Sequence, residues 1–183
     1  SSGLDPAWLP DGKRVAFARW GGQSPGIYLI DGDGKNETQV FGSEMAKSPV
    51  WSPDGKRLAI SYKHGEDNSG RARWKLGVIR VQDQHFSEVL CWDYSFSPTW
   101  ALDGNVIAYY YISYGIFLTS EDGSIGGQTY GLHEYALILD ADATSPAWSP
   151  DGTQIAYMYD EREPAEIYLM NPRGEHRTKL TDI

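Results

Sequence analysis

Residues 146–157 read PAWSPDGTQIAY, and the same twelve-position pattern occurs four times in this chain of 183 residues. The other copies read PAWLPDGKRVAF at 6–17, PVWSPDGKRLAI at 49–60 and PTWALDGNVIAY at 98–109. The Asp residues of successive copies lie 43, 49 and 48 residues apart. A pattern that returns at this period indicates a repeat architecture, in which each copy is one structural unit.

Each copy predicts four short strands joined by tight turns. Asp-Gly is the strongest short hairpin signal, and its glycine supplies the positive φ that a tight turn requires. An apolar run follows the turn, as in Val15–Trp20 and Val106–Ile112. A second apolar run, such as Ile27–Ile30, and a last segment, such as Thr38–Phe41, complete the unit. Four antiparallel strands within 43–49 residues match the size of one β-propeller blade.

This repeat resembles that of TolB-type, WD-like β-propeller proteins. The resemblance covers residues 5–183 and rests on Pro-Ala-Trp-Ser-Pro-Asp-Gly, then Ile-Ala-Tyr, then Ile-Tyr-Leu-Met. It implies an all-β propeller with four blades of four antiparallel strands, at about 5–48, 49–97, 98–145 and 146–183. In that family the repeat occurs in TolB-like envelope proteins and in the propeller domains of prolyl-oligopeptidase-like and tricorn-like peptidases.

The number of repeats bears on whether the propeller is closed. TolB-like propellers typically have six or more blades, so we expect four repeats to be part of a larger propeller. A complete four-bladed ring is the alternative. The open ends of an arc would expose apolar sheet faces, which a further blade, another chain or another domain would cover.

The repeated Trp, Asp and Gly residues are expected to have structural roles. Each Trp would pack between neighbouring sheets, and each Asp would cap its own turn. Four equivalent turns offer equivalent carboxylates, whereas acid–base catalysis needs groups in different environments. The motif residues are Trp8, Asp11, Gly12, Trp51, Asp54, Gly55, Trp100, Asp103, Gly104, Trp148, Asp151 and Gly152.

Composition disfavours several functional classes. The chain has 16 Lys and Arg against 25 Asp and Glu, a net charge of −9, so a nucleic-acid partner is not expected. No run approaches 18 consecutive apolar residues, so no membrane-spanning segment is expected. The single cysteine, Cys91, excludes an internal disulfide framework.

Catalytic, metal and cofactor sites are not expected either. The string at Gly22–Gly26 matches Gly-x-Ser-x-Gly, but it lies between two predicted strands and is interpreted as a hairpin loop. The four histidines lack metal-ligand spacing. Asp31–Glu37 begins like a calcium loop, but no bidentate glutamate follows at the twelfth position. We therefore predict no catalytic residue, metal or cofactor in this chain.

The third repeat differs from the others in charge and aromatic content. No Lys or Arg occurs from Val81 to Glu161, and residues 98–145 carry six acidic residues. Strand alternation would point Tyr109 and Tyr111 to one face and Tyr110 to the other, with one set in the core. Exposed tyrosines beside carboxylates indicate a partner surface, because aromatic residues are enriched at interfaces. A diverged blade whose acids are merely solvated is the alternative. The candidate surface consists of Tyr110, Tyr111, Tyr114, Glu121, Asp122, Asp140 and Asp142.

These observations favour a non-catalytic propeller scaffold that binds a protein or peptide through loops on a rigid frame. One alternative is a propeller domain that controls substrate access in a peptidase. A second alternative is small-molecule or sugar binding in the axial channel. The family resemblance implies a periplasmic or extracellular location, with a cytoplasmic one left open.

Overall fold

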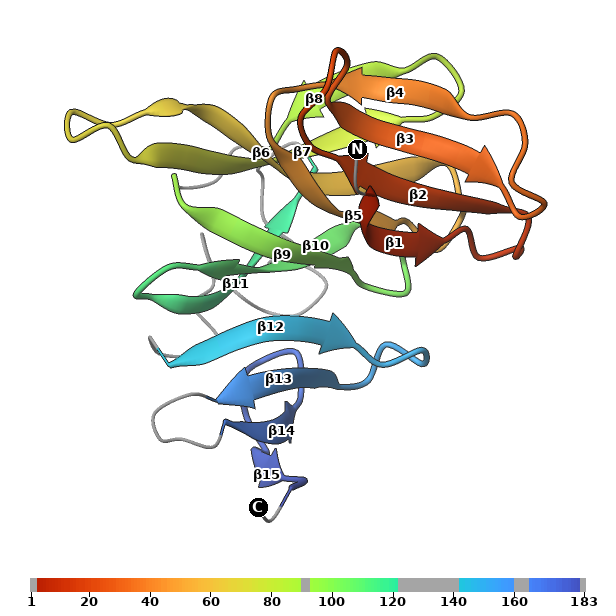
Figure 1. Ribbon diagram of the computed structural model, residues 1–183. Coiled ribbons are helices and arrows are strands. Elements are labelled where there is room, and N and C mark those ends of the chain that lie inside the picture. Colours follow the sequence, from red (N-terminus) through yellow and green to blue (C-terminus); the bar gives the residue numbers. More distant parts are fainter. Residues whose placement is uncertain (1–2, 90–92, 122–141, 160–164, 182–183) are drawn as a thin grey trace. The chain divides into compact units, whose positions relative to one another are not determined.

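The computed structural model describes residues 3–89, 93–121, 142–159 and 165–181 (Figure 1). These residues form fifteen β-strands and contain no helix, so the expected all-β class is confirmed for them. In particular, the part of the chain described has no helix that is long and apolar enough to cross a membrane. The chain divides into two compact units, residues 1–89 (unit one) and residues 90–183 (unit two).

Unit one consists of two four-stranded antiparallel sheets, in which each strand pairs with its neighbours in sequence. Blade one contains β1 (Gly3–Trp8), β2 (Arg14–Arg19), β3 (Gly26–Asp31) and β4 (Thr38–Gly42). Blade two contains β5 (Ala46–Trp51), β6 (Arg57–Glu66), β7 (Ala72–Arg80) and β8 (His85–Glu88). The β6–β7 hairpin is longer than the corresponding hairpin of blade one (Figure 1).

Unit two repeats this organisation. Blade three contains β9 (Ser95–Trp100), β10 (Val106–Tyr111) and β11 (Gly115–Ser120), with β10 in the centre. Blade four contains β12 (Ala143–Trp148), β13 (Ile155–Tyr159), β14 (Glu166–Met170) and β15 (Thr178–Lys179). The fourth strand that the repeat predicts for blade three falls within residues 122–141, outside the described residues.

The Asp-Gly turns join the first two strands of every blade, as the sequence predicts. Each Asp accepts a hydrogen bond from the backbone N–H two residues later, at 2.9–3.0 Å. Each following glycine has a φ of 68–72°, a region that favours glycine. The carboxylates therefore stabilise the turns, and the expected capping role is confirmed for Asp11, Asp54, Asp103 and Asp151.

A β-bulge interrupts the first strand of every blade. The residue before the repeat proline has a φ of 51–52°, although proline normally favours an extended residue before it. The strand pairings shift register at the same point. Each first strand also begins three residues before this proline, so the expected blade boundaries at 49, 98 and 146 lie inside strands. The residues with positive φ are Asp5, Ser48, Ser97 and Ser145.

Within each unit, the first strand of one blade packs against the preceding blade. Strand β5 contacts β1, β2 and β3, and β12 contacts β9, β10 and β11. Small residues such as Ala16 and Ala108 are fully buried near these contacts and leave room for the neighbouring sheet. This arrangement is the packing of successive propeller blades.

The repeated tryptophans have unequal environments. Trp51 and Trp100 are buried as expected, and the Trp51 indole N–H donates to the Ala7 carbonyl at 3.1 Å, which links the two blades of unit one. Trp148 is half-buried. Trp8 departs from the expectation, because 61% of it is exposed. Trp8 lies on β1 of blade one. The contact between blades one and two is made by Trp51 of blade two and not by Trp8.

Candidate functional site

Two candidate surfaces lie at the same position of successive repeats. In each blade the Asp-Gly turn lies at one end of the central strands, and the turn between the second and third strands lies at the other. We call the latter the hairpin end. In blade two the Lys63 N–H donates to the Met45 carbonyl at 2.8 Å, and in blade three the Ile112 N–H donates to the Tyr94 carbonyl at 3.2 Å. The donor and the acceptor of the second bond each lie 49 positions after those of the first. The two hairpin ends therefore have the same backbone framework.

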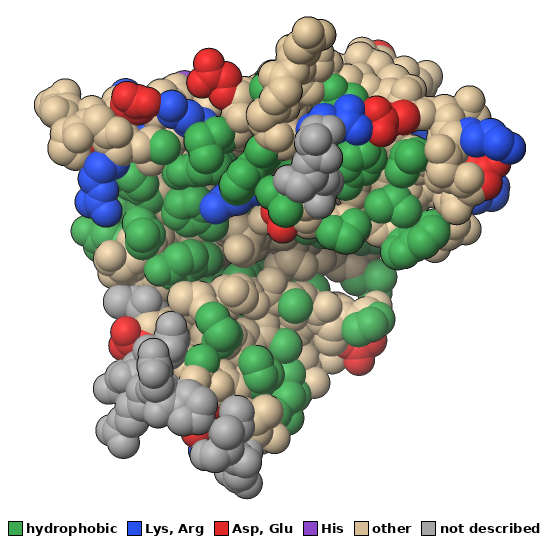
Figure 2. Space-filling model, viewed as in Figure 1, with side chains coloured by type: hydrophobic (Ala, Val, Ile, Leu, Met, Phe, Trp, Pro, Cys, Tyr) green, Lys and Arg blue, Asp and Glu red, His purple; other side chains and the backbone are tan. Residues whose placement is uncertain are grey.

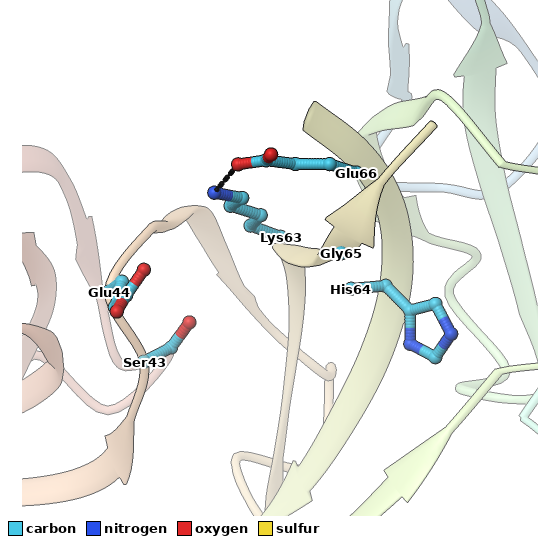
Figure 3. A pocket seen from close by; sticks show the side chains of 6 residues that line it. All are labelled: Ser43, Glu44, Lys63, His64, Gly65 and Glu66. Carbon is cyan, nitrogen blue, oxygen red and sulfur yellow. Dashed lines mark hydrogen bonds and ion pairs between the residues drawn. The ribbon is translucent and has the colours of Figure 1, made fainter. Parts of the chain in front are cut away.

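An open hollow of about 450 Å3 lies at the hairpin end of blade two. The Lys63 ammonium lies 2.7 Å from a Glu66 carboxylate oxygen, as Figure 3 shows. This hydrogen bond, with a smaller electrostatic contribution from Glu44, raises the pKa of Lys63. The Ser43 hydroxyl donates to the Met45 carbonyl at 3.2 Å. The hollow therefore contains a cation that is already paired with a carboxylate of the same chain. Its lining residues are Ser43, Glu44, Lys63, His64, Gly65 and Glu66.

A second charged group surrounds Glu88 on β8. Its carboxylate accepts hydrogen bonds from the Tyr62 hydroxyl and from Lys75 at 2.8 Å, and it lies 3.2 Å from His64 Nδ1. Figure 3 shows the His64 imidazole directed away from Lys63 and Glu44. Partial burial of Glu88 opposes its ionisation, but the hydrogen bonds from Lys75 and Tyr62 outweigh burial, so its pKa lies below the ordinary value. These contacts fix the base of the β6–β7 hairpin.

The hairpin end of blade three carries aromatic and aliphatic side chains. The Tyr111 and Tyr114 rings stack with centroids 4.6 Å apart and planes 7° apart. Tyr111 also meets Phe117 edge-on at 5.6 Å, which anchors the stack to β11. Tyr114 is 56% exposed and Ile112 is 39% exposed. The result is an exposed apolar surface on an anchored hairpin.

The predicted partner surface is only partly gathered there. Tyr109 and Tyr111 both contact Phe117, whereas Tyr110 packs against Phe96, so the predicted alternation is confirmed. Tyr109 belongs to the core, being fully buried. Of three other predicted residues, one lies away from the Tyr111–Tyr114 stack and two lie outside the described residues. Glu121 follows β11 at the Asp-Gly end, and Asp122 and Asp140 are not described.

Asp142 and Asp93 occupy equivalent turns before the first strands of blades four and three. The sequence analysis did not select Asp93, although aligning the copies at Trp51 and Trp100 places it opposite Glu44. Partial burial, then the charges of Tyr114 and Asp93, raise the pKa of Tyr111. Asp93 directly precedes Tyr94, whose carbonyl accepts the hydrogen bond from Ile112. Aligning the repeats beyond the twelve-residue motif would have found this residue.

The remaining chemistry is structural. The Gly22–Gly26 segment is the β2–β3 loop, as expected, and its Ser24 carbonyl accepts the Tyr28 hydroxyl at 2.6 Å. Asp31 accepts a hydrogen bond from the Asn36 side chain, and Asp33 accepts one from the Lys35 N–H. Within the described residues no group of three or more His, Cys, Asp or Glu side chains is arranged to hold a metal ion.

The fold matches those of solved propeller structures. TolB from Acinetobacter baumannii superposes with a TM-score of 0.72 at 18% identity, over 96% of this chain and 42% of that one. A protein from Agrobacterium tumefaciens assigned as TolB gives a TM-score of 0.73 at 19% identity, over 100% of this chain and 62% of that one. The fold is that of the TolB-type β-propeller.

Enzymes also share this architecture. Acylaminoacyl peptidase from Pyrococcus horikoshii superposes with a TM-score of 0.62 at 19% identity, over 97% of this chain and 32% of that one. No protein-family model and no curated protein sequence matches the chain. The chain thus spans less than two thirds of the two TolB-type chains, and the likeness at these identities concerns the fold.

Proposed function

We propose that this chain is a non-catalytic β-propeller scaffold that binds a protein or peptide partner. The observation that carries the proposal is the hairpin end of blade three, where Ile112 and Tyr114 are exposed while Tyr111 is anchored on Phe117. Tyrosine offers a large, rigid contact area, and exposed aromatic residues on a fixed frame are typical of interaction hot spots. The family resemblance supports a periplasmic or extracellular location for this binding.

The carboxylates of the repeated Asp-Gly turns are used in turn hydrogen bonds, which supports a role without catalysis. Asp11, Asp54, Asp103 and Asp151 each cap their own turn. In Asp151, hydrogen bonds from Ser149 and Thr153 lower the pKa to about 2. A general acid or base near neutral pH requires the opposite shift. All four carboxylates therefore stabilise turns, and Asp151 in particular is poorly suited to proton transfer near neutral pH.

A site-specific crosslinking experiment tests the proposal. Benzoylphenylalanine would replace Tyr114 in the full-length protein within its native cells, and light would then trap any neighbour. The matched control places the same group at Asn105, which is exposed at the Asp-Gly end of the same blade. We expect a discrete crosslinked protein from position 114 and none from position 105. No product at 114, or the same products from both positions, would overturn the proposal.

A propeller that controls substrate access in a peptidase is the second candidate. It is favoured by the match to the acylaminoacyl peptidase of Pyrococcus horikoshii. A hydrolase domain in the same gene would support this candidate, because the catalytic groups would then lie outside this chain. A crosslink from position 114 to a separate protein would favour the scaffold instead.

A further inference from the structure

Within a unit, the two blades meet through two different sheet faces. In unit one, blade two contributes a face with Trp51, Leu58 and Ile60, and blade one contributes a face of smaller side chains. We call these the leading face and the trailing face of a blade. The Trp51 indole N–H also donates to the Ala7 carbonyl at 3.1 Å across this contact. The trailing face of blade one is at most 3% exposed and consists of Ala16, Ala18, Ile27 and Leu29.

Unit two repeats this contact. The trailing face of blade three, with Ala108, Ile116 and Leu118, forms one buried cluster with the leading face of blade four. Ile155 and Tyr157 represent the leading face in this cluster. The described part of the chain therefore contains two examples of the same contact between blades, each made of one leading face and one trailing face.

The leading face of blade one is open. Trp8 is largely exposed, whereas its counterpart Trp51 is 7% exposed. Val15 and Phe17 are half-buried, although the residues at the same positions of blade two are fully buried. Among the described residues of unit one, none covers this face in the way that blade one covers the leading face of blade two.

The Asp-Gly turn of blade one is open in the same way. A Cβ on Gly55 would lie 3.0 Å from the Leu9 side chain of blade one, and a Cβ on Gly152 would lie 3.1 Å from that of Leu102 in blade three. A Cβ on Gly12 would meet no described atom within 4 Å. The turns of blades two and four therefore each lie against the preceding blade, whereas the turn of blade one has no such neighbour among the described residues.

The trailing face of blade four is open as well. The strand positions that form the trailing face of blade one are occupied in blade four by Ala156, Met158, Ile167 and Leu169. Ile167 is 37% exposed where its counterpart in blade one is fully buried, and the other three are half-buried. Leu180, whose N–H donates to the Ile167 carbonyl at 2.8 Å, is on the same side of the sheet and is 55% exposed.

The two open faces are the two halves of one contact, so a second copy of the chain can cover both. Blade four reads PAW at 146–148, as blade one does at 6–8. In unit one, the Trp51 indole donates to the alanine of the earlier string. The Ala147 carbonyl can therefore accept the Trp8 indole N–H of a second copy in the same manner. Exposed apolar faces of this kind mark association surfaces.

Charge favours a contact between unlike units. Unit two carries four Lys and Arg against 14 Asp and Glu, whereas unit one carries 12 against 11. Figure 2 shows most of the visible blue Lys and Arg side chains over unit one. A contact between two copies of unit two would bring two acidic surfaces together, and a contact of unit two with unit one avoids this repulsion. Arg19, on the leading face of blade one, is paired with Glu37 at 2.7 Å, so covering this face would not bury an unpaired guanidinium.

We propose that the chain forms a dimer in which the trailing face of blade four in each copy packs on the leading face of blade one in the other. Both faces of each copy are then covered, so assembly closes at two copies. Two copies of four blades each contain eight blades, which is within the range of about four to eight found in most propellers. The dimer goes beyond the scaffold function and does not use the Tyr114 surface, so either proposal can fail without the other.

Sedimentation of the full-length protein between about 1 and 100 μM tests this proposal, and we expect the mass of a dimer. Trp8→Glu and Ile167→Glu each place a carboxylate in the contact and should raise the dissociation constant at least about tenfold. The matched control is Leu102→Glu, at a leucine that is 54% exposed at the Asp-Gly end of blade three, and it should change the constant less than about twofold. A monomer throughout this range would overturn the proposal, because the faces would then be open or covered within one polypeptide.

A mixing experiment separates this contact from other dimers. Trp8 and Ile167 are both exposed, so both variants should fold. When Trp8→Glu and Ile167→Glu are mixed, one of the two contacts of the mixed dimer combines two unaltered faces. We expect the mixture to associate at least about fivefold more tightly than either variant alone. A mixture that does not recover, or a dimer that Ile167→Glu leaves unchanged, would show that unlike faces do not pair.

Discussion

At the hairpin end, blade two places Lys63 where blade three places Ile112, on backbones that make the same hydrogen bond. Blade two pairs this cation with Glu66 of its own hairpin. Blade three presents the stacked rings of Tyr111 and Tyr114. The repeat preserves the strands and turns while the side chains at this end vary freely. Function in such a fold is therefore to be sought where one copy departs from its neighbours.

The largest expected effect concerns the core beneath the blade-three surface. Tyr109 is fully buried and packs against Phe117 at 5.9 Å between ring centroids. Tyr109→Ala should lower the free energy of unfolding of unit two by about 3–5 kcal/mol, because it leaves a large cavity. Urea unfolding, monitored through the hydrogen exchange of blade-three amides, would measure this loss of free energy. A loss below about 1 kcal/mol would show that the tyrosine stack has no rigid support.

An intermediate effect is expected at the charged network of blade two. Glu88→Gln removes the ionised acceptor of Tyr62 and Lys75 and should cost about 1–2 kcal/mol at pH 7. The pKa of Glu88 is lower in the folded state than in the unfolded chain. Its contribution is therefore present above the ordinary glutamate pKa of about 4.3 and is lost as the pH falls through the folded value.

Stability measured against pH checks this sign. The unchanged protein should lose stability more steeply than Glu88→Gln between about pH 5 and pH 3. Asp83→Asn is the control and should leave the slope nearly unchanged, because the 3.1 Å ion pair of Asp83 with Arg80 is exposed to solvent. Parallel curves for the Glu88 variant and the unchanged protein would contradict the assigned network.

The smallest effect is expected at the exposed tyrosine. Tyr114→Ala removes a ring that is 56% exposed and loses mainly its stacking on Tyr111. The free energy of unfolding should fall by no more than about 1 kcal/mol. A thermal unfolding midpoint within a few degrees of the unchanged protein would show that Tyr114 is dispensable for folding. A loss as large as that of Tyr109→Ala would place Tyr114 in the core.

The repeat made the strands and turns predictable because they depend on local chemistry. Asp-Gly fixes a turn by its own hydrogen bond and positive φ, and the same string gave the same turn at Asp11 and Asp151. The expected strand Thr38–Phe41 differs from β4 by one residue. The fold class was predictable because repeated units of four antiparallel strands are typical of β-propellers.

Features that depend on distant contacts were not predictable in this way. The exposed Trp8 and the buried Trp51 have closely similar local sequences, and Trp51 is buried because it packs on the neighbouring sheet. The positive φ of Ser48 before proline contradicts the local preference and is accompanied by a hydrogen bond from its N–H to Asp5 of the adjacent blade.

Crosslinking from position 114 of the full-length protein tests the central claim most directly, with Asn105 at the Asp-Gly end of the same blade as the matched control position. If the hairpin end of blade three binds a partner, position 114 should give a discrete crosslinked protein and position 105 should give none. No product from position 114, or the same products from both positions, would contradict the claim that this end of blade three is the partner surface.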